Sequence, residues 1–243
     1  MEIRIIHFYP HLMSLYGSYA NVAVLRRYLE QLGNTVTVET VDYGQAASVA
    51  EADFIFMGAG TEGAAKAAMA DFERFAPALK AAAEAGTAML FAGTSMELLG
   101  KSVTTAAGET YDGIGLADFV TVQQEGRIVG DVYGHTDLYP EAVVGFMNKA
   151  SVTTGVKTPL LTSVDMGIGN EGTGTPEGYR EKNVFASQLT GPILVKNPPL
   201  LRAVVAAIYE RRGVELPGEL PENRYAENGY AITAEQLKKR SEK

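Results

Sequence analysis

The sequence predicts an α/β protein with a mostly parallel sheet that carries helices on both faces. The first observation is that strand and helix signals alternate through the first 100 residues, as they do in βαβ units. The second is that short small-residue turns follow two of the expected strands, where open α/β sheets place their ligand sites.

Four short runs in this half have the length and the β-branched or aromatic content of strands. They are Ile3–Phe8, Thr35–Val41, Asp53–Met57 and Thr87–Ala92. The run Thr35–Val41 alternates with period two, which is typical of a half-buried strand, whereas the other three are mostly apolar, as buried strands are. We therefore expect three central strands and one strand with an exposed face.

The segments between these runs have helical patterns. Apolar residues in Asn21–Leu32 recur at helical spacing, and Gly33 follows where a helix C-cap belongs. Residues 63–85 are rich in Ala, Lys and Glu, which predicts a single helix that ends at Gly86. A short helix is expected after the strand that ends at Ala92.

The second half predicts a different arrangement, with strands around turns and two further helices. The expected elements are a β-hairpin formed by Phe119–Gln123 and Arg127–Val132 about Glu125-Gly126, strands in Val143–Asn148, Leu160–Gly169 and Asn183–Leu189, a helix over Leu200–Arg212 and a short basic helix near Thr233–Lys239. We expect a main domain over residues 1–213 and a C-terminal extension over residues 214–243.

Composition excludes several classes of protein. Cysteine is absent from the 243 residues, so disulfides, thiolate metal sites and a cysteine nucleophile are excluded, and we expect no metal and no cofactor. The net charge of −8 argues against nucleic acid as a partner. The N-terminal residues lack the pattern of a signal peptide and no run is long enough to cross a membrane, so a cytoplasmic protein is expected.

The order of strand, small-residue turn and helix around Ala92 is typical of a nucleophile elbow. Such a turn presents one side chain at the sheet edge and directs backbone N–H groups toward a developing oxyanion. The candidate pocket consists of Gly93, Thr94 and Ser95 after one strand and Gly58 and Gly60 after another. Alanine at the strand end offers no chemistry.

Seven segments, in the same order and at similar spacing, resemble class I glutamine amidotransferases of the CobB/CobQ type, and most of all the GatD-type subunits of lipid II isoglutaminyl synthases. They are residues 15–32, Asp53–Gly60, Ala88–Lys101, Tyr111–Phe119, Gly126–Asp131, Val144–Asn148 and Leu189–Asn197. This resemblance covers residues 1 to about 213 and implies a flavodoxin-like three-layer fold.

The sequence departs from that family at the positions that carry its chemistry. The family uses an elbow cysteine activated by a histidine, and the resemblance matches these to Ala92 and Thr190. Neither residue can replace its counterpart, and losing such groups costs a serine protease on the order of 10⁶ in kcat. We therefore expect no glutaminase activity. The resemblance matches Arg127 to an arginine near the approach to the family's glutamine pocket, and Arg127 and Asn148 are possible ligand contacts.

The resemblance also implies a partner, because GatD-type subunits work beside a Mur-ligase-like subunit of the MurT type. The leading hypothesis is a catalytically degenerate subunit in a heterodimer with such a ligase, acting in amidation of a peptidoglycan precursor. The alternatives are an enzyme with repurposed chemistry in the emptied cleft, a small-molecule sensor that uses the same cleft, and a still active amidotransferase.

Overall fold

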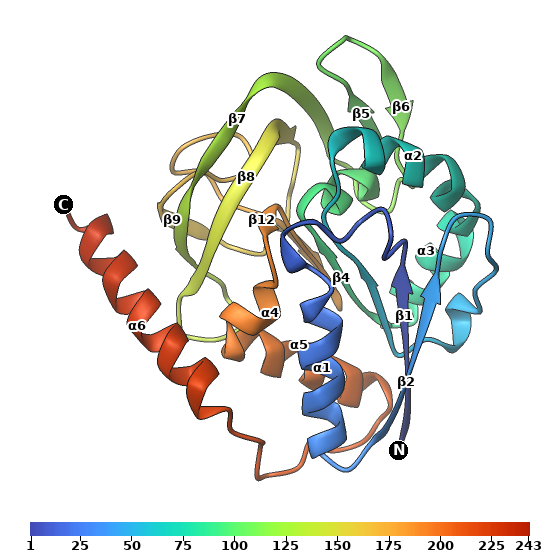
Figure 1. Cartoon of the computed structure of the whole chain (residues 1–243), viewed down its shortest axis with the longest axis vertical. Coiled ribbons are helices and arrows are strands. Elements are labelled where there is room, and N and C mark those ends of the chain that lie inside the picture. Colours follow the sequence, from blue (N-terminus) through green and yellow to red (C-terminus); the bar gives the residue numbers. More distant parts are fainter.

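The computed structural model describes residues 1–243 and contains two six-stranded sheets (Figure 1). The first sheet has the order β10-β11-β4-β3-β1-β2. Its strands are β1 (Glu2–Phe8), β2 (Thr35–Val41), β3 (Phe54–Met57), β4 (Ala88–Ala92), β10 (Tyr179–Glu181) and β11 (Val184–Ser187). Every neighbouring pair is parallel except β10 with β11.

Helices cover both faces of this first sheet, which gives three layers. One face packs against α1 (Ala20–Gln31) and α5 (Pro198–Arg211), and the other against α2 (Glu62–Phe72) and α3 (Ala76–Glu84). Because side chains alternate along a strand, Leu90 and Ala92 of β4 pack on the face covered by α1 and α5, while Phe91 packs on the face covered by α2 and α3. The predicted fold class, a mostly parallel sheet flanked by helices, is confirmed.

The single helix predicted over residues 63–85 is two helices. The 3-10 helix η3 (Glu73–Phe75) separates α2 from α3, and Pro77 lies in the first turn of α3. Proline fits a first helical turn, where no backbone donor is needed, but in a helix interior it removes a hydrogen bond and clashes. The Ala-rich pattern concealed this break.

The second sheet packs beside the first and has the order β12-β8-β7-β5-β6, with β9 also paired to β7. Its strands are β5 (Ser102–Thr104), β6 (Thr110–Asp112), β7 (Val120–His135), β8 (Val143–Thr154), β9 (Ser163–Met166) and β12 (Leu189–Thr190). The longest pairing is antiparallel, between β7 and β8.

The predicted hairpin around Glu125-Gly126 is wrong. Both of its arms belong to the single strand β7, which pairs with β8 on each side of an irregularity between Gln123 and Ile128. Gly126 has φ +87°, a conformation that serves a β-bulge as well as a hairpin turn. The actual hairpin turn lies between His135 and Val143.

The chain ends on the second sheet. After the short helix α4 (Ile193–Lys196) and α5, residues 214–223 form no regular element, and α6 (Arg224–Ser241) then lies along β7 and β8 (Figure 1). This helix is much longer than the one expected near Thr233–Lys239, although Leu237 is its only buried residue. None of the helices combines the length and hydrophobicity that crossing a bilayer requires.

His7 generates a prediction on acid stability. Its ring is 5% exposed, lies 5.0 Å from the Phe56 ring between centroids, and has no partner for Nε2. Burial lowers the pKa of His7 from 6.5 to about 4. Between pH 6.5 and 4 the imidazole of His7 is therefore protonated in the unfolded chain but neutral in the folded chain. This difference lowers the stability of the fold as pH falls through that window.

Between pH 7 and pH 4, the ionisation of His7 lowers the free energy of unfolding by about 3 kcal/mol. Urea unfolding of the wild type and of His7→Leu between pH 7 and 4 measures it, because the variant lacks this ionisation and keeps every other one. The difference in unfolding free energy between the two proteins should change by that amount in favour of the variant. A constant difference across the range would contradict the assignment to His7.

Candidate functional site

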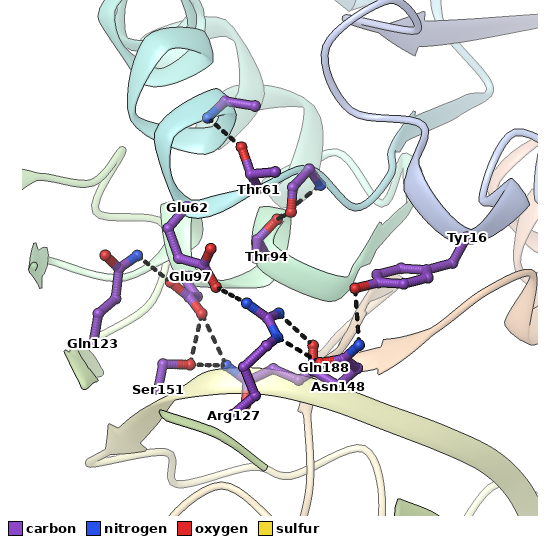
Figure 2. A network of polar contacts seen from close by, with 12 residues as sticks. Tyr16, Thr61, Glu62, Thr94, Glu97, Gln123, Arg127, Asn148, Ser151 and Gln188 are labelled. Carbon is purple, nitrogen blue, oxygen red and sulfur yellow. Dashed lines mark hydrogen bonds and ion pairs between the residues drawn. The ribbon is translucent and has the colours of Figure 1, made fainter. Parts of the chain in front are cut away.

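A narrow cleft lies where the carboxyl ends of β3 and β4 face strand β8 of the second sheet (Figure 2). Its walls come from the 3-10 helix η1 (Leu15–Gly17), the loop after β3, the turn after β4, β7, β8 and the β11–β12 connection. The lining residues are Tyr16, Ala59, Gly60, Gly93, Thr94, Glu97, Arg127, Asn148, Lys149, Gln188 and Thr190. The free volume is only about 10 Å³, which is room for about one water molecule.

The sharp turn after β4 falls at Gly93. This residue has φ +70°, a left-handed conformation that glycine adopts without steric cost. Ala92 is instead the last extended residue of β4, with φ −116° and ψ 134°, and its side chain packs in the core beneath α1 and α5. The expected strand also ended at Ala92, but the sequence expectation placed the elbow on that last strand residue, whereas the left-handed turn falls on the next residue, Gly93.

Ala59 occupies the space beside Gly93 that a side chain would need. A Cβ atom added at Gly93 would lie 2.6 Å from the Cβ of Ala59 and 3.2 Å from its Cα. Carbon atoms without a bond between them do not approach so closely. Any side chain at the elbow thus requires the loop after β3 to move or Ala59 to become smaller.

The Thr94 side chain bonds to the loop that follows β3, at Gly60. Gly60 N–H donates to Thr94 Oγ1 at 2.9 Å, and this hydroxyl donates in turn to the Gly60 carbonyl oxygen at 3.0 Å. An oxyanion site needs backbone N–H groups that are free to receive the developing charge. Here the Gly60 donor is already engaged by the protein itself.

The remaining hydroxyl groups are also engaged by backbone. Ser95 is fully buried and donates to the carbonyl oxygens of Met57 and Ala92, and Thr190 Oγ1 donates to the Phe146 carbonyl at 2.9 Å. No histidine lines the cleft. The three histidines lie against Phe56, Asp42 and Asp165, so no imidazole stands beside any of these hydroxyls.

Exposed hydrogen bonds cross the mouth of the cleft. Arg127 Nε donates to Asn148 Oδ1 at 2.5 Å, while its Nη1 contacts Glu62 Oε1 at 3.0 Å. Asn148 Nδ2 donates to the Tyr16 hydroxyl at 3.0 Å (Figure 2). The two expected ligand contacts, Arg127 and Asn148, are therefore adjacent, and they bind each other.

A buried network fills the floor of the cleft. Gln188 Oε1 accepts from Lys149 Nζ at 2.7 Å, and Gln188 Nε2 donates to Ser151 Oγ at 3.1 Å and to Glu97 Oε1 at 3.4 Å. Glu97 also accepts from Ser151 Oγ at 2.7 Å and from Gln123 Nε2 at 3.1 Å (Figure 2).

Burial controls the ionisation of this network. It raises the pKa of Glu97, against the hydrogen bonds from Ser151 and Gln123, and lowers the pKa of Lys149 to about 8. Lys149 Nζ also donates to the carbonyl oxygens of Gly169 and Asn170 at 2.7 and 3.3 Å, so all three of its protons are used within the protein. The group is a structural cation and not a free amine.

The structure brings most of the sequence-predicted residues together. Gly60, Gly93, Thr94, Arg127, Asn148 and Thr190 line the cleft, whereas Gly58, Ala92 and Ser95 do not. Sequence reasoning missed Tyr16, Ala59, Glu97 and Gln188 as lining residues. Glu97 lies in the 3-10 helix η4 (Gly93–Leu99) that follows the turn, and Gln188 lies two residues before Thr190. A carboxylate and a carboxamide so close to predicted site residues could have indicated that they line the cleft.

The fold is that of the glutamine amidotransferases. The PurLQS structure from Thermotoga maritima superposes with a TM-score of 0.52 at 13% identity and covers 86% of this chain and 99% of its own. A glutamine amidotransferase from the same organism gives 0.52 at 10% identity, with 98% and 95% coverage. At such identities the likeness concerns the fold alone.

Sequence comparison places the chain within one branch of that class. Residues 4–198 match the model of the CobB/CobQ-like glutamine amidotransferase domain, and the chain belongs to this family, which confirms the resemblance inferred from the sequence. Two relatives are both named lipid II isoglutaminyl synthase (glutamine-hydrolyzing) subunit GatD. The Staphylococcus aureus protein is 29% identical over 88% of this chain and 87% of its own length, and the Streptococcus pneumoniae protein is 31% identical over 89% and 85%.

The contact between Ala59 and Gly93 generates a prediction of coupled stability. Gly93→Ala should cost about 3 kcal/mol in the wild type, from overpacking and from a side chain at positive φ. In an Ala59→Gly background the same change should cost about 1 kcal/mol, because only the backbone strain remains. Urea unfolding of the four proteins measures this coupling. Equal costs in both backgrounds would show that Ala59 does not fill the elbow.

The buried network generates a second prediction. Gln188→Leu removes the partner that links Lys149 to Glu97, so it should lower the unfolding free energy by about 3 kcal/mol. Asn148→Ala is the matched control, because it removes comparable hydrogen bonds at the exposed mouth and should cost under about 1 kcal/mol. Denaturant unfolding compares the two variants, and a loss of equal size in both would refute a central role for the floor.

Proposed function

We propose that this chain is a catalytically inactive glutamine amidotransferase-like subunit that pairs with a Mur-ligase-like protein in the amidation of lipid II. The observation that carries the proposal is the elbow, where Gly93 occupies the turn and Ala59 occupies the adjacent space. We assign the nucleophile position to Gly93 in place of Ala92, because the strained turn of such elbows carries the nucleophile.

Three independent features oppose hydrolysis of glutamine in this cleft. The elbow offers no nucleophile, the matched histidine position is Thr190, whose hydroxyl is bound to Phe146, and the Gly60 N–H is bound to Thr94. Each of the first two losses alone removes almost all activity in a comparable catalytic unit. A nucleophile restored without the other two changes would still lack both a base and a free oxyanion donor.

The names of the relatives support the proposed pathway, and the family resemblance suggests the partner. Both curated relatives are named as GatD subunits of lipid II isoglutaminyl synthase, which supports a role for this chain as a subunit in lipid II amidation. The family resemblance adds a MurT-type Mur ligase as the expected partner, in the cytoplasm. In this assignment residues 1–213 form the amidotransferase-like unit, residues 214–243 form its extension, and the ligase takes ammonia from another source.

The volume of the cleft weighs against the two alternatives that need a new ligand in it, the sensor and the repurposed enzyme. A sensor or a repurposed enzyme needs room for a small molecule, and ligand pockets are typically about 300–1,000 Å³. The cleft has about 10 Å³, and its own Gln188 carboxamide makes hydrogen bonds at its floor. Either alternative would require the network of Gln188, Lys149 and Glu97 to open.

Purification of the chain with the Mur-ligase-like protein of the same organism tests the proposal. The two proteins should copurify in equal amounts. The complex should amidate lipid II when supplied with ATP and ammonium chloride, but not with ATP and glutamine, because no ammonia is released in the cleft. Mass spectrometry of the lipid product gives the readout, and the complex of the S. aureus relative, which is expected to use glutamine, is the positive control.

Two results would contradict the proposal. Release of glutamate from glutamine by the purified chain or the complex, above the level of a heat-inactivated sample, would show an active site. Absence of a complex on size-exclusion chromatography, with both proteins folded, would remove the subunit role.

A further inference from the structure

A second hollow, separate from the cleft, lies between α6 and the second sheet. Its volume is about 470 Å³, within the range of sites for small molecules. Phe146 and Val144 of β8, Val195 of α4 and Leu237 of α6 provide apolar walls. Two charged residues, Asp131 and Lys196, line the same space.

These two charges face the hollow without pairing to each other. Lys196 Nζ has no hydrogen bond and no ion pair within the protein. Asp131 binds Arg240 through Oδ2 at 2.5 Å, which leaves Oδ1 without a partner. Partial desolvation lowers the pKa of Lys196, the charge of Asp131 opposes that shift, and no ion pair within 4.0 Å joins the two groups.

The hollow lies beside α6, which several side-chain contacts attach to the rest of the chain. Tyr230 donates to the Ala142 carbonyl at 2.7 Å, Arg202 pairs with Glu227 at 2.6 Å, and Arg240 pairs with Asp131. The helix lines the space with the small residues Ala226, Gly229 and Thr233 and with the larger residues Tyr225, Tyr230 and Leu237. The contacts fix the helix in place without filling the gap.

We propose that this hollow binds a free α-amino acid with an apolar side chain. The ligand carboxylate pairs with Lys196, the ligand ammonium pairs with Asp131 Oδ1, and the side chain packs against Phe146 and Leu237. A zwitterion matches a cation and an anion that are too far apart to pair directly, and each contact is a charge-assisted hydrogen bond. The site is independent of the function proposed for the cleft.

Such a ligand would connect α6 to the body of the protein. Its partners would be Leu237 on the helix and Lys196, Asp131 and Phe146 on the body. Since Leu237 is the only buried residue of α6, a further set of contacts should slow local opening of the helix. This effect provides a readout that is separate from affinity.

Isothermal titration calorimetry with L-leucine tests the proposal on the full chain. Two analogues, 4-methylpentanoate and 3-methylbutylamine, each lack one charged group and should bind about tenfold more weakly or worse. Lys196→Met and Asp131→Asn should weaken leucine binding by a similar factor. Lys157→Met, at an exposed lysine outside the hollow, is the control and should leave binding unchanged.

Hydrogen exchange by mass spectrometry is the second measurement. Leucine should slow exchange in residues 224–241 of the wild type but not in those of Lys196→Met. The exchange of the same residues in Asp131→Asn without leucine also reports whether α6 stays docked in that variant. No heat of binding and no slower exchange at millimolar leucine would overturn the proposal. Equal affinity for 4-methylpentanoate would overturn the zwitterion as the ligand class, and binding that survives Lys196→Met would place the ligand elsewhere.

Discussion

The hydrogen bonds of the Gln188 carboxamide hold the two sheets together at the cleft. Gln188 lies between β11 and β12, where the chain leaves the first sheet and enters the second. Its side chain binds Glu97 on the elbow side and Lys149 on β8, and Lys149 then binds the loop at Gly169 and Asn170. Because charges buried this deeply must be paired and hydrogen-bonded, the positions of elbow, strand and loop are mutually dependent.

The cleft has the outline of an active site but the internal contacts of a protein core. In an enzyme, preorganised donors remain free until the substrate arrives, and that freedom costs stability. Here the equivalent groups are satisfied within the chain: Gly60 N–H by Thr94, the Thr190 hydroxyl by Phe146, and Arg127 by Asn148 and Glu62. The polar groups at this sheet edge are thus bound to partners within the chain.

The sequence predicted the first sheet better than the second, for physical reasons. Strands β1, β3 and β4 are mostly buried and β2 is half-buried at the sheet edge, so each is a short apolar or alternating run that periodicity detects. Strand β7 contains the polar pair Glu125-Gly126 in its middle, and a glycine at positive φ accommodates a bulge as readily as a turn. At the site, motif order located the loops and the end of β4, but the backbone conformation that places the turn on Gly93 and not on Ala92 is not visible in the sequence pattern. A shift of one residue from Ala92 to Gly93 exchanges a core position for the cleft.

The close packing of Ala59 against the turn at Gly93 also limits how this lineage can evolve. A substitution that restores a side chain at Gly93 is penalised for as long as Ala59 is present. A change of Ala59 to glycine brings no benefit by itself, because the turn still lacks a reactive group. Neither step is selected alone, so the two positions form an epistatic pair, and a side chain at position 93 becomes accessible only together with a smaller residue at position 59.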